Sequence, residues 1–466
     1  LFGLRRDTDI LSRAARSAYL NPLTLPDTYR GTPAEAIAAL RAGIQRAERR
    51  IAEYRASIEH LREMRIHHLR HLLWRVRASH TLADTIARYG RLRYTYLVSG
   101  WVPTALVPRL QDSVSRVSDQ VVIEVGSPRD VGVEGADVPV ALNNPPFLRA
   151  FQGLVTNYGQ PRYGELDPTP VLALTFPLVF GIMFGDVGHG VVLALIGLLV
   201  TSRRVRFLRG LASLGPILVA CGAAAVIFGF LYGSIFGYED VLTAIWLRPL
   251  EDVMDILIYT IVIGVVLLSI GILYSIANAA LDKEWGEMLF GRNGVAGLIF
   301  YWSLVGLAVG IFAQKSPIST DVLFGLAAVS GVAVAFSELL VRVLERRSPM
   351  IEGSLGTYLM QAFFELFETV ISLLSNTLSY VRMGAFAVAH GGLSLVVFIL
   401  ADIFSPEHGL VYWVIVALGN LFVIGFEGLI VGIQTLRLEY YEFFSKFFSG
   451  TGLRHHPLTL IAREEE

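Results

Sequence analysis

The sequence predicts an α-helical polytopic membrane protein with about eight transmembrane helices, the last two long and tilted, behind an N-terminal cytoplasmic α+β domain that bears a coiled-coil arm. Two observations lead to this fold class. Hydrophobic residues make up 53% of the 466 positions, which is high for a soluble protein. Charge is also uneven, since residues 1–168 hold 40 of the 79 Asp, Glu, Lys and Arg residues. A polar front therefore precedes an apolar, membrane-embedded rear.

The composition excludes several kinds of site and partner. The single cysteine, Cys221, cannot form an internal disulfide or a cysteine-based metal cluster. A net charge of −1 removes the case for nucleic-acid binding by bulk charge. Residues 1–168 contain neither a phosphate-binding glycine loop ending in Lys-Ser/Thr nor a metal-spaced His/Cys set. We therefore expect no cofactor, no metal or nucleotide site and no nucleic-acid partner.

The polar front, residues 1–168, begins without an initiator Met or a targeting segment, so we expect N-terminal sequence to be missing. Thr32, Pro33 and Glu35 predict a helix start, because a Thr cap, a Pro in the first turn and a Glu three residues on satisfy early amides. Apolar residues then recur at spacings of three and four, which predicts a coiled-coil helix over about 33–76. The seam residues are Ile37, Leu40, Ile44, Ala47, Ile51, Tyr54, Ile58, Leu61, Leu69, Leu72 and Val76. A seam needs a partner helix, from the missing sequence or from another chain; the alternative is an ordinary amphipathic helix packed on a globular body.

Short strands are expected beyond this helix. Tyr94–Val98 and Val121–Val125 are rich in β-branched and aromatic residues, so they suggest a small α+β domain at the foot of the arm. His67, His68 and His71 fit a solvated helix face better than a set of metal ligands.

A transmembrane domain is predicted over 169–448, where seven apolar runs are each long enough for a crossing of about 20 residues. The runs cover roughly 169–200, 210–237, 255–281, 294–314, 320–341, 357–403 and 410–448. The first run contains a glycine-rich polar break made of Gly185, Asp186, Gly188 and His189. We expect this break to fold the run into a tight helical hairpin, which raises the number of crossings to eight.

Basic residues set the orientation, because they concentrate on the cytoplasmic side of membrane proteins. They follow the first, fifth and last runs: Arg203, Arg204, Arg206 and Arg209; Arg342, Arg346 and Arg347; Lys446 and Arg454. The loops between the other runs are acidic or poor in basic residues. Both termini are then cytoplasmic, and residues 449–466 form a cytoplasmic tail.

The run 357–403 carries a polar stripe. Its members, at spacings of three and four along one helix face, are Glu368, Ser372, Ser375, Ser379 and Arg382. An Arg at mid-membrane costs about 2.5–3.5 kcal/mol on insertion scales, so Arg382 should line a wet cavity or meet a carboxylate. As one helix the run would be about 70 Å long, so it must tilt or extend beyond the bilayer.

The last run repeats the pattern in the opposite direction. Glu427 and Gln434 lie at heptad spacing, and Arg437 follows Gln434 on the same face. Glu427 is then about 15 Å nearer the outer surface than Arg437, and His390 lies about two turns outward of Arg382. We interpret these groups as two offset half-channels that lead protons from opposite surfaces to a central positive barrier. The alternative is a set of buried ion pairs that holds the helices together.

Five stretches of the sequence carry a family likeness. They are SGWVP (99–103), YGQPRYGELDPTP (158–170), FPLVFGIMFGDVGHG (176–190), SNTLSYVRMGAFAVAHGGLS (375–394) and GIQTLRLEYYEFFSKFF (432–448). In these stretches the chain resembles the large membrane stator subunit of V-type and A-type rotary ATPases, called subunit a or subunit I. The segment VRMGAFAVAH differs from the LRLWALSLAH typical of eukaryotic members, which favours a bacterial or archaeal plasma membrane.

The resemblance implies roles for the charged residues. Arg382 and Arg437 would face a rotor ring of proteolipid subunits and discharge its carboxylates as each passes, assisted by Gln434. The half-channel residues would be Glu368 with Ser372, Ser375 and Ser379 on the cytoplasmic side, and His390 with Glu427 on the outer side. Peripheral stalk subunits would bind the cytoplasmic domain and connect it to the ATPase head. Any ATPase activity would belong to partner subunits, and the chain alone would not be an enzyme.

Two other functions fit the sequence less well. A secondary transporter should show an internal repeat with broken helices at matching positions, but the sequence has one broken segment, at 185–190. An intramembrane hydrolase built on Asp186 and His189 is disfavoured, because the pair has no second carboxylate or metal ligand nearby in the sequence and suits a helix turn better.

Overall fold

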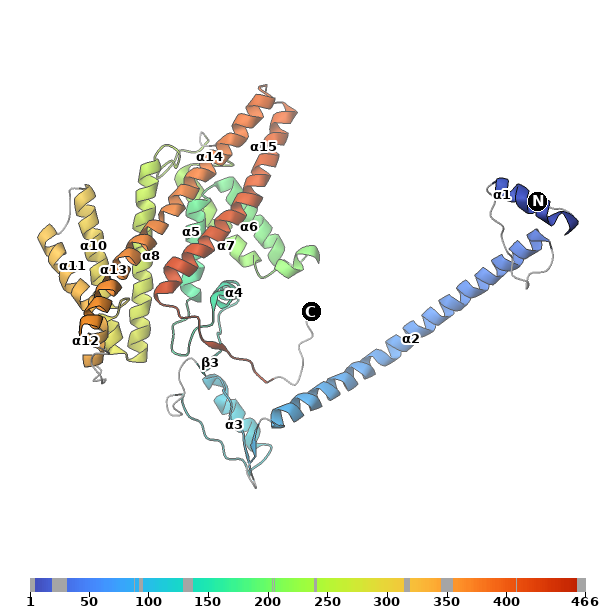
Figure 1. The fold of residues 1–466 in the computed structure, drawn as a ribbon, viewed down its shortest axis with the longest axis horizontal. Helices are drawn as coiled ribbons and strands as arrows, with labels where there is room; N and C mark the ends of the chain where they lie inside the picture. Colours follow the sequence, from blue (N-terminus) through green and yellow to red (C-terminus); the bar gives the residue numbers. More distant parts are fainter. Residues whose placement is uncertain are drawn as a thin grey trace. The chain divides into compact units, whose positions relative to one another are not determined.

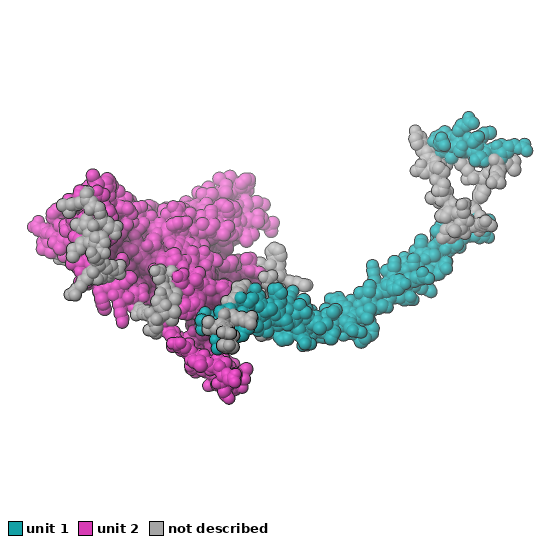
Figure 2. All heavy atoms as spheres, turned by 60° about the horizontal axis from the view of Figure 1, so that its bottom comes forward, with its two compact units in different colours: residues 1–100, 457–466 teal, residues 101–456 magenta. Residues whose placement is uncertain are grey.

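The computed structural model describes residues 5–18, 32–87, 89–91, 95–128, 137–202, 204, 206–238, 241–313, 319–344, 355–407 and 409–458. Tyr94, at a predicted strand start, and the basic residues Arg203, Arg346 and Arg347 lie outside these residues. The chain divides into two compact units, residues 1–100 with 457–466 and residues 101–456 (Figure 2). This division falls at residue 100, whereas the sequence analysis places a domain boundary at 168.

The first unit is dominated by one long helix (Figure 1). Its elements are η1 (Arg5–Asp7), α1 (Thr8–Ser17), α2 (Pro33–Ala87) and the antiparallel strands β1 (Gly90–Arg91) and β2 (Tyr96–Leu97). At the start of α2 the Glu35 carboxylate accepts a hydrogen bond from the Thr32 amide at 2.8 Å, as a capping box requires. The helix continues past the predicted end at residue 76.

The apolar seam of α2 is open to solvent in the described residues of this unit. Ile44, Ile51 and Ile58 remain 56%, 50% and 64% exposed. A helix packed on a globular body would bury such a seam, and the coiled-coil interpretation of these residues stays a prediction.

The second unit begins with small elements, of which the helix Arg149–Tyr158 packs against the apolar helix Thr169–Met183. They are η2 (Thr104–Leu106), α3 (Val107–Ser115), α4 (Arg149–Tyr158), and β3 (Pro139–Val140), which pairs in parallel with β4 (Leu453–Arg454). Residues 121–127 contain no strand, so the prediction at Val121–Val125 was wrong. β-branched side chains favour a strand only where a neighbouring strand packs beside them, and Val122 is 94% exposed.

The apolar helices of the second unit follow in chain order (Figure 1). They are α5 (Thr169–Met183), α6 (Val187–Thr201), η4 (Arg206–Leu211), α7 (Gly215–Tyr232), α8 (Val253–Asp282), α9 (Trp285–Phe290), α10 (Val295–Ala313), α11 (Thr320–Ala335), α12 (Ser337–Leu344), α13 (Leu355–Ser379), α14 (Val381–Phe404), α15 (Leu410–Phe422), the π-helical turn η5 (Val423–Glu427), α16 (Gly428–Arg437), the π-helical turn η6 (Leu438–Phe443) and η7 (Phe444–Lys446).

Five helical segments in the described residues are long and apolar enough to cross a membrane, and six if α11 and α12, bent by 68°, form one span. The five are Gly215–Tyr232, Val253–Asp282, Trp285–Ile311, Gly356–Phe404 and Leu410–Lys446. The two helices α5 and α6 are apolar but shorter. The described residues thus form a polytopic helical structure, with five or six candidate membrane spans as judged by helix length and composition.

Helix α7 packs against both α5 and α6, which the sequence analysis expected to form a tight hairpin. The chain turns between Met183 and Val187, and glycines let α7 approach both arms. A Cβ at Gly181 of α5 would lie 2.8 Å from the backbone of Ala224, and one at Gly190 of α6 would lie 2.8 Å from the backbone of Gly222. Small residues permit this close backbone approach, as in other membrane helix pairs.

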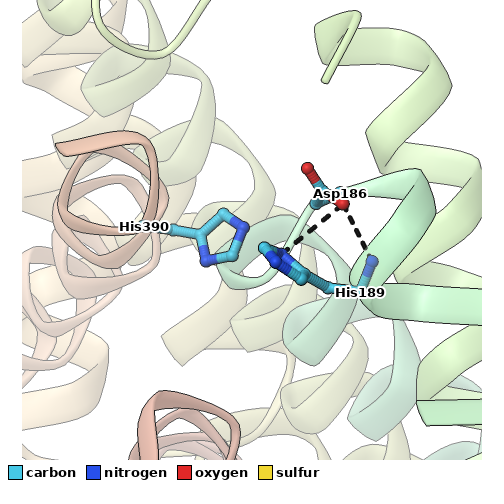
Figure 3. A group of neighbouring side chains, drawn as sticks. All are labelled: Asp186, His189 and His390. Atoms are coloured by element: carbon cyan, nitrogen blue, oxygen red, sulfur yellow. Dashed lines mark hydrogen bonds and ion pairs between the residues drawn. The ribbon is translucent and has the colours of Figure 1, made fainter. Parts of the chain in front are cut away.

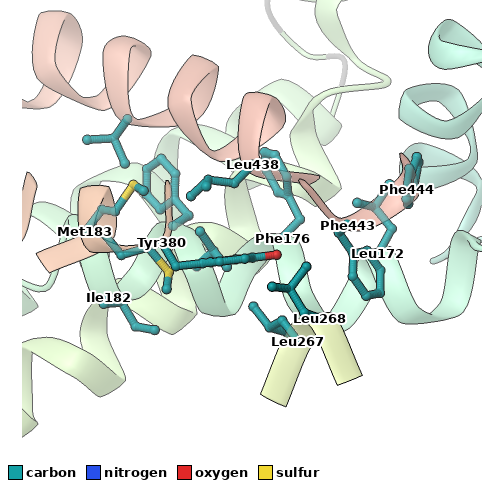
Figure 4. Packing of buried hydrophobic residues seen from close by; sticks show 14 of the residues in the cluster. Leu172, Phe176, Ile182, Met183, Leu267, Leu268, Tyr380, Leu438, Phe443 and Phe444 are labelled. Atoms are coloured by element: carbon teal, nitrogen blue, oxygen red, sulfur yellow. The ribbon is translucent and has the colours of Figure 1, made fainter. Parts of the chain in front are cut away.

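A buried apolar core connects α5, α8 and the last helix around the junction of α13 and α14 (Figure 4). Its members include Leu172, Phe176, Ile182, Met183, Leu267, Leu268, Tyr380, Leu438, Phe443 and Phe444. The run predicted as one helix is interrupted at Tyr380. The Tyr380 ring packs against Gly264 of α8, where an added Cβ would lie 2.5 Å from the ring. The core therefore fixes the start of α14, where Arg382 lies.

Candidate functional site

Arg382 occupies the first turn of α14 and is largely enclosed by protein. Its Nη2 atom lies 3.9 Å from Oε1 of Glu442, and the two side chains are 20% and 7% exposed. Its Nη1 atom is buried with no hydrogen-bond partner among the described residues. A guanidinium so close to a carboxylate but not fully hydrogen-bonded retains the capacity to bind a further anionic group.

Arg437 ends α16 on the open face of the last helix. Phe426, Leu429 and Ile433, which precede it at helical spacing, are 55%, 63% and 54% exposed, and Arg437 is also exposed. Glu442 interacts electrostatically with both arginines. The two arginines are therefore neighbours, one enclosed and one on an exposed apolar surface.

Two buried acidic residues that follow Arg437 in the chain were not predicted from the sequence. Glu439 and Glu442 lie in the π-helical turn η6 and are 2% and 5% exposed. The Tyr380 hydroxyl, from the α13–α14 junction, is buried near both carboxylates and has no hydrogen-bond partner in the part of the chain that the structure describes. A sequence signal was available, because a carboxylate in an apolar membrane run is as unusual as an arginine, and π-helical turns frequently mark functional sites.

A second polar cluster lies two turns beyond Arg382 on α14, which is about 12 Å along the helix axis. His390 Nδ1 is 2.9 Å from Glu427 Oε2, and both side chains are 4% exposed. This contact and that of Arg382 with Glu442 show that α14 and the last helix run antiparallel. The sequence-predicted residues of the outer side are therefore brought together.

The break between α5 and α6 contributes to this second cluster (Figure 3). His189 packs its ring against that of His390, with centroids 5.2 Å apart. His189 Nδ1 lies 3.5 Å from Asp186 Oδ1, and His189 Nε2 lies 2.5 Å from Oδ1 of Asn420. From the sequence, Asp186 and His189 were predicted only as residues of a helix turn, and Asn420 was not predicted.

Asp186 caps α6 and holds the loop that follows α7. Its Oδ1 accepts hydrogen bonds from the amides of His189 and Phe236, each at 2.9 Å. Its Oδ2 accepts from the Ser234 hydroxyl at 2.6 Å and from the Gly237 amide at 2.8 Å. The carboxylate is wholly buried, and these four donors compensate the burial of its charge.

The polar stripe of α13 lies in a more open setting. Glu368 is 72% exposed and forms an ion pair of 3.1 Å with Arg292, which the sequence analysis did not select. Ser372 accepts a hydrogen bond from Asn376 at 3.5 Å, and the Ser379 hydroxyl donates to the carbonyl of Ser375 at 2.9 Å. Gln434 Oε1 of α16 is buried and has no hydrogen-bond partner among the described residues.

Apolar helices in five or six spans, with ionisable side chains buried between them, define a multi-pass membrane protein. The chain belongs to the V-type ATPase 116kDa subunit family, whose model matches residues 24–241 and 346–460. The matched parts include both arginines, both histidines of the second cluster and the break between α5 and α6.

Three archaeal relatives are each described as an A-type ATP synthase subunit I. The one from Aeropyrum pernix is 28% identical over 94% of this chain and 68% of its own length. That from Methanocaldococcus jannaschii is 26% identical over 92% of this chain and 64% of its own length. That from Thermococcus kodakarensis is 28% identical over 79% of this chain and 54% of its own length. The chain thus spans roughly half to two thirds of the length of these relatives.

Proposed function

We propose that this chain is the membrane stator subunit of a prokaryotic rotary ATPase or ATP synthase, and that it provides two offset half-channels for protons or Na⁺. It binds no nucleotide and is not an enzyme by itself. Its partners are a rotor ring of proteolipid subunits, peripheral stalk subunits on residues 1–168 and, through them, the ATPase head. It lies in a bacterial or archaeal plasma membrane with both termini in the cytoplasm.

The observation that carries this proposal is the pair of arginines placed between two polar clusters. Arg382 is enclosed beside Glu442, and Arg437 lies on an exposed apolar face. A ring carboxylate that passes this face is attracted by the positive charge and releases its proton. Protons cannot cross between the clusters directly, because two adjacent cations repel them.

The two clusters serve as the half-channels. The buried pair of His390 and Glu427 leads from the outer side, and the stripe that starts at Glu368 leads from the cytoplasmic side. Gln434, with a buried unpartnered oxygen, assists at the arginines. Helices α5 and α6 each cross in this proposal, at about 22 Å for 15 residues of helical rise, which brings the spans to eight.

The proposal is tested in the assembled complex by substitution of Arg382. Arg382→Ala should abolish coupled ion transport while the complex still assembles, and Arg382→Lys should restore it only in part, because an ammonium lacks the planar guanidinium fork. Arg248→Ala, in a loop ion pair with Glu251, is the control and should pump normally. Wild-type pumping by the alanine variant would refute the proposal.

The sidedness of the half-channels is tested separately. In a Cys221→Ala background, Glu368→Cys and Glu427→Cys are exposed to a membrane-impermeant thiol reagent in sealed vesicles of known orientation. We expect labelling of position 368 from the cytoplasmic side and of position 427 from the outer side. Labelling of both positions from one side would contradict the assignment without affecting the role of Arg382.

A further inference from the structure

The buried histidines of the second cluster are held in defined tautomers. His189 Nε2 lies 2.5 Å from Asn420 Oδ1. The orientation of the Asn420 amide is fixed, because its Nδ2 donates to the carbonyl of Val416 at 2.8 Å. The Asn420 atom that meets the histidine is therefore an acceptor, so Nε2 carries the hydrogen. In the neutral ring, His189 Nδ1 then carries a lone pair and no hydrogen.

The same reasoning applies to His390. Its Nδ1 lies 2.9 Å from the Glu427 carboxylate, which accepts the hydrogen, and the lone pair is therefore on Nε2. Both His189 Nδ1 and His390 Nε2 are buried and lack a hydrogen-bond partner among the described residues. Two lone-pair nitrogens on adjacent rings thus lie at one place in the protein (Figure 3).

An anionic oxygen completes the group. Asp186 Oδ1 lies 3.5 Å from His189 Nδ1, and the ligating atoms of Asp186, His189 and His390 all lie within 4.8 Å of one another. His189 and Asp186 are fully buried, and His390 is 4% exposed. The Asp186 oxygen and the His189 lone pair repel each other across this dry site, and a cation between them would replace that repulsion by attraction to both.

We propose that Asp186, His189 and His390 form a binding site for a divalent transition metal ion of the zinc class. Two imidazoles and a carboxylate are the donor set that such ions favour. Tetrahedral Zn–N bonds of about 2.0–2.1 Å separate ligand atoms by about 3.3 Å, close to the spacing of His189 Nδ1 and Asp186 Oδ1. Since the three ligating atoms lie within 4.8 Å of one another, the third ligand must approach by up to about 1.5 Å for tetrahedral binding.

The surroundings resemble the supporting groups of metal sites. Each ligating imidazole gives its other N–H to an oxygen, Glu427 for His390 and Asn420 for His189, and such contacts orient the ring and raise its basicity. Asp186 is positioned by donors from the start of α6 and from the loop that follows α7. The ligands come from segments far apart in the sequence, which is why the sequence analysis expected no metal site.

A pocket lies beside this group. It has a volume of about 430 Å³, and its lining includes Phe236, Tyr238, Trp413 and Asn420. Asn420 accepts the hydrogen bond from His189, and the Phe236 ring packs edge-on against the same imidazole with centroids 5.6 Å apart. Asn420 and Phe236 therefore both line the pocket and contact His189, and they separate the pocket from the imidazole.

The test measures Zn²⁺ binding to the full chain in lipid nanodiscs by competition with a chromophoric chelator. His67 and His71, one turn apart on exposed α2, can chelate weakly, so all measurements use a His67→Gln/His71→Gln background. We expect one Zn²⁺ per chain. His189→Gln or His390→Gln should weaken binding by more than about 100-fold, and Glu427→Gln by about 10–100-fold, the usual loss for a supporting group.

Co²⁺ provides a readout of geometry. Bound Co²⁺ should show the visible absorption of a tetrahedral N/O site, and that absorption should vanish in His189→Gln and in His390→Gln variants that elute as folded protein. The proposal is overturned if the background chain binds no Zn²⁺, or if both histidine variants bind as it does. The second result would mean that a proton or water, and not a metal, satisfies these atoms.

One consequence rests on the proposed function. Zn²⁺ bound at His390 withdraws that imidazole from proton transfer, so Zn²⁺ added on the outer side should inhibit coupled transport, and His189→Gln should relieve the inhibition at least tenfold. Site-specific binding without inhibition would refute this consequence and leave the metal site standing. Loss of transport in Arg382→Ala tests the stator role independently of any metal.

Discussion

Substitution of Asp186 by Asn tests how the break between α5 and α6 is held. The carboxylate accepts four hydrogen bonds, two at each oxygen. Asn presents one oxygen and one NH2 group of the same shape. The better orientation keeps the oxygen opposite the amides of His189 and Phe236 and places the NH2 group opposite Ser234 and Gly237. The Ser234 hydroxyl can rotate to accept, but the Gly237 amide then faces another donor.

The expected loss follows from these contacts. A buried amide without an acceptor costs about 1–3 kcal/mol, and the remaining hydrogen bonds lose the strength that the charge gave them. Relief from burying a charge offsets part of this loss. We expect Asp186→Asn to reduce the free energy of unfolding by about 2–4 kcal/mol, and Asp186→Ala to reduce it further, because all four donors then lose their acceptor.

The assay is unfolding of the full chain in mixed micelles by titration with a denaturing detergent. Asp321→Asn, an exposed acid in the first turn of α11, is the matched control and should change stability by less than about 1 kcal/mol. Equal stability of the Asp186→Asn and Asp321→Asn variants would refute the account of Asp186 as the acceptor that fastens the loop at 234–237.

Two further predictions concern helix packing and the arm. Gly222→Ala places a Cβ 2.6 Å from the backbone of α6, so it should reduce the free energy of unfolding by about 1–3 kcal/mol in the same assay. Gly325→Ala is the control, because nothing lies within 4 Å of its added Cβ, and it should cause no loss of stability. Similar losses for both variants would contradict the packing argument. Replacement of the exposed seam residues Ile44, Ile51 and Ile58 by Asp should uncouple or disassemble the complex, as measured by ATP-driven pumping and co-purification. A triple variant that stays assembled and coupled would show that the seam binds no partner helix.

The sequence determined the features that depend on local pattern. Apolar length fixes a polytopic helical protein, because only helices satisfy their backbone within a bilayer. Thr32 and Glu35 mark the start of α2, since the hydrogen bond between the Thr32 amide and the Glu35 carboxylate is local. Arg382 and Arg437 stand out from the sequence alone, because an arginine in an apolar run is costly and therefore rare. Membership of the family follows from the same sequence segments.

Only the tertiary structure decided which distant groups meet. The packing of α7 against both α5 and α6 depends on glycine contacts between helices, which a hydropathy pattern does not contain. The enclosure of Arg382 by Glu442 and the meeting of His189 with His390 join segments far apart in the chain. Periodicity reports the face of a helix on which a residue lies, whereas a binding site requires the atoms of several helices at one point, and packing alone sets that point.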